Sequence, residues 1–80
     1  MPDIGVLYIV STPIGNLEDI TLRALRILKD SSLIAAEDTR QTKKLLNHYK
    51  IHTPQMSYFE HNRFKRIPQI INHLNSGKDI

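Results

Sequence analysis

Cysteine and tryptophan are absent from this sequence, and glycine occurs only three times in 80 residues. Without a thiol, the chain can form neither a disulfide framework nor a thiolate metal site, which fits a reducing cytoplasm. The first apolar run, residues 6–10, is too short for a membrane span or for the apolar core of a signal peptide. With 40% apolar and 24% charged residues, the composition predicts a soluble, globular and cytoplasmic protein with no membrane partner.

A metal centre built from imidazoles is not expected either. The four histidines, which are His48, His52, His61 and His73, lack a spacing typical of metal ligands. A helix end is predicted between His48 and His52, so a shared helical face is doubtful for this pair. Because a protein metal site needs three or four converging ligands, we expect none.

The charged residues are distributed unevenly along the chain. Residues 1–39 contain six acidic and three basic side chains, whereas residues 40–78 contain eight basic side chains and one acid, Glu60. A one-sided basic excess suits a polyanionic partner such as RNA. A solvated basic surface without any partner explains the same charges equally well.

Three short segments predict strands at residues 6–10, 33–36 and 55–59, the first of them buried on both faces as in parallel sheets. Apolar residues at helical spacing follow each one. The first helical segment, residues 17–29, carries Glu18 and Asp19 at its start and basic residues towards its end, which suits the helix dipole.

For the other two predicted helices, single residues indicate where each helix begins or ends. Asp38 or Thr39 can cap the second helix. Pro68 is best tolerated in a first turn, so we expect the third helix to start firmly near Arg66. Gly77 is a natural stop for that helix.

This alternation of strands and helices predicts an α/β fold with a parallel sheet flanked by helices. Lys78, Asp79 and Ile80 follow the helix stop at Gly77, where a fourth strand is expected to begin. We therefore expect residues 1–80 to be an incomplete N-terminal domain of a longer protein, truncated at the start of a fourth strand.

Two polar clusters follow strand ends, where parallel α/β sheets bind their ligands. The first, residues 11–16, contains Thr12, Pro13, Gly15 and Asn16. It matches neither a Walker loop nor a dinucleotide-binding glycine motif, and by itself it is also explained by a plain turn.

The second cluster contains Glu37, Asp38 and Arg40. One carboxylate is a candidate to orient or deprotonate a hydroxyl while Arg40 holds a phosphate. The alternative is structural: one carboxylate caps the next helix and the other pairs with Arg40 or Lys43. Both explanations stay open from these residues alone.

Basic residues also recur at helical spacing and among aromatic rings. Arg40, Lys43 and Lys44 share a polar stripe of the second helix. Further along, Tyr58, Phe59 and Phe64 alternate with basic side chains, a pattern that can bind single-stranded RNA. Tyr58 and Phe59 can instead end a strand inside the core, and we expect this role for at least one of them.

Three motifs in order resemble one known family. Residues 7–24, with the turn Ser-Thr-Pro-Ile-Gly-Asn after the first strand, resemble the opening motif of the 16S ribosomal RNA cytidine 2′-O-methyltransferases, a branch of the tetrapyrrole methylase family. Ala36 to Arg40 and Glu60 to Asn62 resemble that family's next two motifs. The wider family carries a Gly-Pro-Gly-type turn after the first strand, so the turn found here favours the RNA branch over the porphyrin-precursor branch.

The resemblance implies S-adenosyl-L-methionine as methyl donor and a cleft between two α/β domains as the site. It implies that Thr12, Pro13, Gly15 and Asn16 line this cleft and that the main donor-binding loops lie beyond Ile80, so that the chain alone is inactive. On the family pattern, Glu37 or Asp38 is the candidate base, and the RNA backbone contacts are Arg40, Lys43 and Lys44.

The implied partner is 16S ribosomal RNA or the small ribosomal subunit, with a homodimer expected for the full-length protein. Two alternatives remain at this point. One is a tetrapyrrole-precursor C-methyltransferase of the same fold, and the other is a non-catalytic RNA-binding module.

Overall fold

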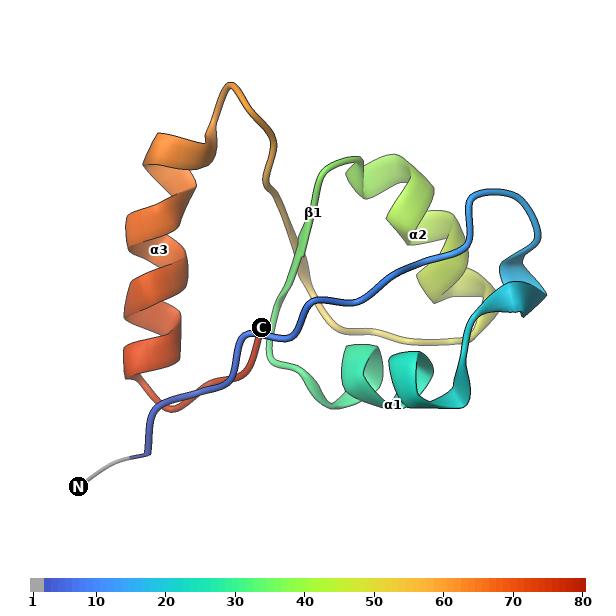
Figure 1. Ribbon diagram of the computed structural model, residues 1–80, viewed down its shortest axis with the longest axis horizontal. Helices are drawn as coiled ribbons and strands as arrows, with labels where there is room; N and C mark the ends of the chain where they lie inside the picture. The colour runs from blue at the N-terminus through green and yellow to red at the C-terminus, as the bar shows by residue number, and fades with distance from the viewer. Residues whose placement is uncertain (1–2) are drawn as a thin grey trace.

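A computed structural model describes residues 3–80 of the chain as an α/β fold (Figure 1). The elements that it contains, in chain order, are the 3₁₀ helix η1 (Leu17–Asp19), α1 (Leu22–Asp30), β1 (Ile34–Ala36), α2 (Thr39–His48), β2 (Gln55–Ser57) and α3 (Arg63–Asn75). The predicted strand–helix alternation is therefore confirmed from residue 17 onwards.

The sheet consists of β1 and β2, which pair in parallel with Ile34 opposite Gln55 and Ala36 opposite Ser57. Figure 1 shows α3 on one side of the sheet and α1 and α2 on the other. This is the predicted parallel sheet flanked by helices. Because both strands run the same way, their carboxyl ends lie at one edge, and the segments that follow them start side by side.

The core lies where α1, α2 and the sheet meet. Its buried members are all aliphatic, namely Leu28, Ile34, Ala36, Leu45, Leu46 and Ile51. The Tyr49 hydroxyl, at the end of α2, donates a hydrogen bond of 2.7 Å to the Leu17 carbonyl. Thr53 donates one of 2.7 Å to the Leu28 carbonyl near the end of α1. These two bonds connect the helices to segments distant in sequence.

Residues 6–10 do not form the predicted buried strand. This segment is extended, but Val6 is 47% exposed and Ile9 is 87% exposed. Its ladder bonds go to a single residue: the Tyr8 N–H donates to the Ile80 carbonyl, and the Ile80 N–H donates to the Val6 carbonyl. This pattern is parallel, since an antiparallel residue would exchange both bonds with one partner. The apolar side chains stay exposed because no further strand packs against this segment among residues 3–80.

The predicted helix over residues 17–29 is divided into η1 and α1. Thr21 has extended backbone angles, and its hydroxyl accepts a hydrogen bond of 3.0 Å from the Ala24 N–H, so α1 has its own cap. Asn16 caps η1 in the same way through the Glu18 N–H. Glu18 and Asp19 consequently lie in η1, and the first turn of α1 contains no acid. The predicted match between charged side chains and the dipole of this helix is therefore found only at the end of α1, where Lys29 lies.

The end of α2 is closed by a residue in the left-handed backbone region. Lys50 has a φ of +55°. Its N–H donates to the Asn47 carbonyl, and the Ile51 N–H donates to the Leu46 carbonyl at 2.9 Å. These two bonds define a Schellman motif, in which glycine is the usual residue at the position that Lys50 occupies.

We expect Lys50→Gly to stabilise the chain by about 0.5–1 kcal/mol, because glycine adopts a positive φ without the steric cost that a Cβ adds. Urea unfolding followed by circular dichroism measures this change. The matched control is Lys44→Gly inside α2, where we expect a loss of about 1 kcal/mol. A loss of stability in both variants would contradict the assignment of Lys50 to this strained position.

The third helix starts three residues before the predicted position. It begins at Arg63, so Pro68 lies inside the helix and not in its first turn. Proline lacks an N–H, so the carbonyl of Phe64 receives no bond from position 68. The predicted stop is confirmed, because Gly77 has a φ of +82° and its N–H donates to the Leu74 carbonyl at 3.0 Å.

Candidate functional site

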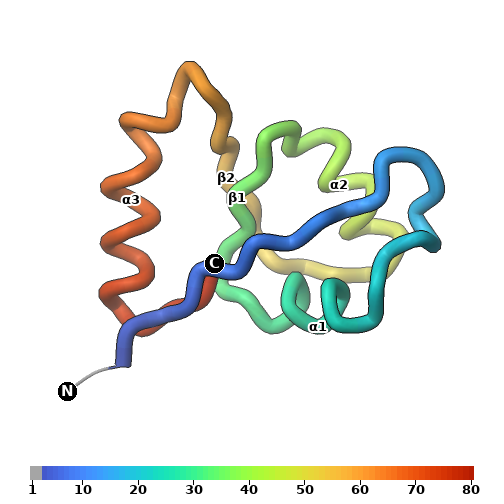
Figure 2. The backbone as a smooth tube through the Cα atoms, viewed as in Figure 1, coloured from blue at the N-terminus to red at the C-terminus, as the bar shows by residue number. Residues whose placement is uncertain are grey.

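A hollow of about 770 Å³ opens beside the carboxyl half of β1. Its walls come from the extended segment of residues 7–10, from β1, from the end of α1, from the start of α2 and from the apolar face of α3. Figure 2 shows the extended segment and β1 in the middle of the molecule and α3 on its left-hand side. Most of the lining is apolar, and Thr12, Glu37 and Asp38 are among its polar residues.

Of residues 11–16, which follow the first apolar run, only some line this hollow. Thr12 lines it, whereas Pro13, Gly15 and Asn16 do not. Gly15 faces open space, since a Cβ built there would meet no atom within 4 Å. The Asn16 side chain is engaged as the cap of η1. Among the described residues, this loop therefore contributes one side chain to the site.

The two adjacent carboxylates have different surroundings. Asp38 Oδ1 accepts hydrogen bonds from the Arg40 N–H at 3.0 Å and the Gln41 N–H at 3.4 Å, so Asp38 caps α2. This geometry confirms the structural explanation for one of the two acids. Glu37 is exposed and follows β1 directly at the edge of the hollow. Glu37 is thus the better placed of the pair to meet a ligand.

We expect Asp38→Ala to destabilise the chain by about 1 kcal/mol, because it removes the acceptor for two otherwise unpaired N–H groups. Asp38→Asn keeps a side-chain acceptor, so we expect its free energy of unfolding to fall by only a few tenths of that amount. Thermal unfolding of both variants measures the difference. Equal losses in the two variants would show that the charge, not the cap, stabilises α2.

The predicted basic stripe is fully on the surface. Arg40, Lys43 and Lys44 are all exposed, while Leu45 and Leu46 on the other side of α2 are buried. The helix therefore presents cations to solvent and its apolar face to the core. None of the three cations lines the hollow, but α2 begins directly at its edge, two residues after Glu37.

Two features of this edge were not predicted from the sequence. Tyr58 follows β2, lines the hollow, and donates its N–H to the Ala36 carbonyl at 2.8 Å. Ser57 accepts hydrogen bonds at its hydroxyl from Asn62 at 3.0 Å and from Arg66 at 3.2 Å. The sequence marked Tyr58 only as one of several aromatic residues among basic side chains, and it marked Ser57 only by its place in the third predicted strand.

The arrangement can hold a hydroxyl near a carboxylate, at the mouth of an apolar hollow and next to a cationic helix. Within residues 3–80, no group of three or more His, Asp and Glu side chains is placed to bind a metal ion. No helix there is long and apolar enough to cross a membrane.

In α/β proteins with a parallel sheet, the carboxyl edge of the sheet is the usual place of ligand binding. The family model described as Tetrapyrrole (Corrin/Porphyrin) Methylases matches residues 6–80. The chain belongs to this family.

Curated relatives within the family share a name. The chain is 58% identical over 78 residues to ribosomal RNA small subunit methyltransferase I of Halalkalibacterium halodurans and 59% identical over 78 residues to the protein of that name from Bacillus subtilis. The Synechocystis protein of the same name is 54% identical over 76 residues. These matches cover 98%, 98% and 95% of the chain, and the chain spans about 27% of each relative's length.

Proposed function

We propose that the full-length protein transfers a methyl group from S-adenosyl-L-methionine to the ribose 2′-hydroxyl of a cytidine in 16S ribosomal RNA. The observation that carries this proposal is the identity of 58% to a small subunit rRNA methyltransferase across nearly the whole chain. The polar edge of the sheet supports it, because a carboxylate and a cationic helix stand there together. A ribosomal substrate places the reaction in the cytoplasm.

In this reaction the ribose oxygen bonds to the methyl carbon as the carbon–sulfur bond breaks, and the bonding electron pair leaves with sulfur. The bound donor supplies a methyl group that is already activated, so alignment provides most of the rate. The exposed Glu37 carboxylate accepts the hydroxyl proton. Thr12 lines the same hollow and contacts the acceptor or donor. Pro13, Gly15 and Asn16 complete the loop on the side of a second domain.

We propose that residues 1–80 form the N-terminal part of this longer, two-domain protein. The relatives' lengths support a larger protein. The backbone bonds of Ile80 to Val6 and Tyr8 support a fourth parallel strand that continues beside the segment of residues 6–10. Such a strand would pair with the backbone of that segment and leave Glu37 at the open edge. The main donor-binding loops then follow that strand, and the chain alone is inactive.

The test is methylation by the purified full-length protein with labelled S-adenosyl-L-methionine. Its substrates are 16S ribosomal RNA and isolated small subunits, with mass spectrometry of the nuclease digest. We expect one 2′-O-methylcytidine that is absent from ribosomes of a strain lacking the gene. Methylation of a tetrapyrrole precursor, or RNA binding without transfer, would replace this proposal by one of the two alternatives. Light scattering of the same sample tests the expected homodimer.

A further inference from the structure

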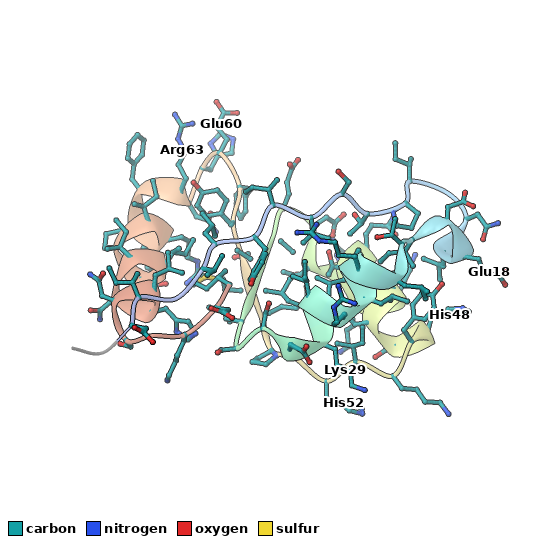
Figure 3. The ribbon with its side chains drawn as sticks, turned by 60° about the horizontal axis from the view of Figure 1, so that its bottom comes forward. Glu18, Lys29, His48, His52, Glu60 and Arg63 are labelled. Atoms are coloured by element: carbon teal, nitrogen blue, oxygen red, sulfur yellow. The ribbon has the colours of Figure 1, made fainter. Side chains whose placement is uncertain are left out.

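A second surface of the molecule combines aromatic rings with positive charge. It comprises Phe59, His61, Arg63, Phe64 and Lys65, and we call it the aromatic corner. It covers the loop after β2 and the first turn of α3. Figure 3 shows Arg63 and Glu60 at the tip of this corner, pointing away from the rest of the molecule.

The rings in the corner are accessible and flanked by nitrogen-bearing groups. Phe64 is 78% exposed and Phe59 is 39% exposed. The Arg63 guanidinium carbon lies 5.1 Å from the centroid of the Phe64 ring. The rings of Phe59 and His61 are 6.3 Å apart and inclined at 69°. A ring and a guanidinium so arranged offer a stacking surface with an adjacent cation.

The loop that carries these rings is held in place by a hydrogen-bond network. The Asn62 side chain accepts from the Phe59 N–H at 2.8 Å and donates to the Ser57 hydroxyl at 3.0 Å. Arg66 Nε donates to the Ser57 carbonyl at 3.0 Å. Arg66 is therefore used inside the molecule, and Arg63 and Lys65 remain as the exposed cations of the corner. A pre-ordered loop loses less conformational entropy when it binds a ligand.

The position of the corner relates it to the candidate site. Ala36 and Ser57 are paired in register, so Glu37 and Tyr58 follow them at the same edge of the sheet. The aromatic corner begins one residue after Tyr58, while the basic stripe of α2 begins on the other flank of that edge. Figure 1 shows the loop before α3 and the start of α2 on either side of the end of β1.

We propose that the aromatic corner binds a single-stranded stretch of RNA next to the nucleotide that is methylated. One base stacks on Phe64 and a second on Phe59, while Arg63 and Lys65 contact the phosphates between them. Glu60, the one acid of this surface, opposes binding and limits its strength. The inference rests on the proposed function, because it assumes that the ligand is RNA and that the methylated nucleotide of this RNA lies at Glu37.

The test uses the full-length protein and a short fluorescent oligoribonucleotide of mixed sequence, either single-stranded or annealed to its complement. Base–aromatic stacking contributes about 1–3 kcal/mol, so Phe64→Ala is expected to weaken single-strand binding about 5- to 150-fold. Binding of the duplex should change little, since its bases are already stacked. Phe64→Tyr should restore single-strand binding, and Glu60→Gln should increase it.

The matched control is Leu22→Ala, which removes an equally exposed apolar side chain (84%) from the first turn of α1. We expect it to bind both RNA forms as the parent protein does. Equal weakening of single strand and duplex by Phe64→Ala, or no weakening of either, would overturn the proposal. The methylation assay above distinguishes this outcome from failure of the proposed function: if only the corner is misassigned, the parent protein still methylates 16S ribosomal RNA.

Discussion

Replacing Glu37 with glutamine is expected to slow methyl transfer by the full-length protein about 10²- to 10⁴-fold, the contribution typical of a positioned general base. Glutamine has nearly the same shape and can still orient a hydroxyl, but it cannot accept the proton. The effect should therefore fall on kcat, with the KM values for RNA and donor nearly unchanged. Single-turnover transfer of labelled methyl groups measures it.

Asp38→Asn is the control for this experiment, because Asp38 caps α2 through two backbone N–H groups. We expect that variant to keep most of its activity. An active Glu37→Gln protein together with an inactive Asp38→Asn protein would reverse the two assignments.

The double variant Arg40→Ala and Lys43→Ala is expected to weaken binding of 16S ribosomal RNA about tenfold or more at moderate salt. Each lost phosphate contact should also reduce the slope of log affinity against log salt concentration by about 0.7–0.9. Both side chains are exposed on α2, and alanine favours helix, so folding should be intact. Donor affinity should not change, because the proposed donor loops lie beyond Ile80.

The matched control removes the same charge from another helix. Arg26 and Lys29 are exposed on α1, and Figure 3 shows Lys29 on the opposite side of the molecule from Arg63. Arg26→Ala with Lys29→Ala should leave the salt slope nearly unchanged. If both double variants reduce the slope equally, the RNA responds to net charge and not to the basic stripe of α2.

Much of the fold was predictable because it depends on neighbours in sequence. The cap at Asp38 and the stop at Gly77 depend on neighbouring residues only. A side chain that accepts from an N–H two residues away, or a residue free to take a positive φ, acts regardless of the rest of the chain. The family was likewise evident in three motifs spaced along the sequence.

The candidate site was only partly predictable. The order of elements placed Thr12 and Glu37 after segments that end near one another, and both line the same hollow. The sequence could not show that Gly15 faces open space or that Tyr58 joins the wall. Those outcomes depend on how loops turn after leaving the sheet, which no residue pattern within the loop specifies.

The sequence by itself therefore determined the α/β class, the family, the cap and the stop of the helices, and the exposed basic face of α2. The tertiary structure alone decided that α3 begins at Arg63, where Asn62 and Arg66 reach back to Ser57. It also decided that Val6, Leu7 and Ile9 stay exposed, although the composition of residues 6–10 suits a buried strand. Burial depends on which segments pack on both sides of a strand, and those contacts join residues far apart in sequence, as Tyr8 and Ile80 are.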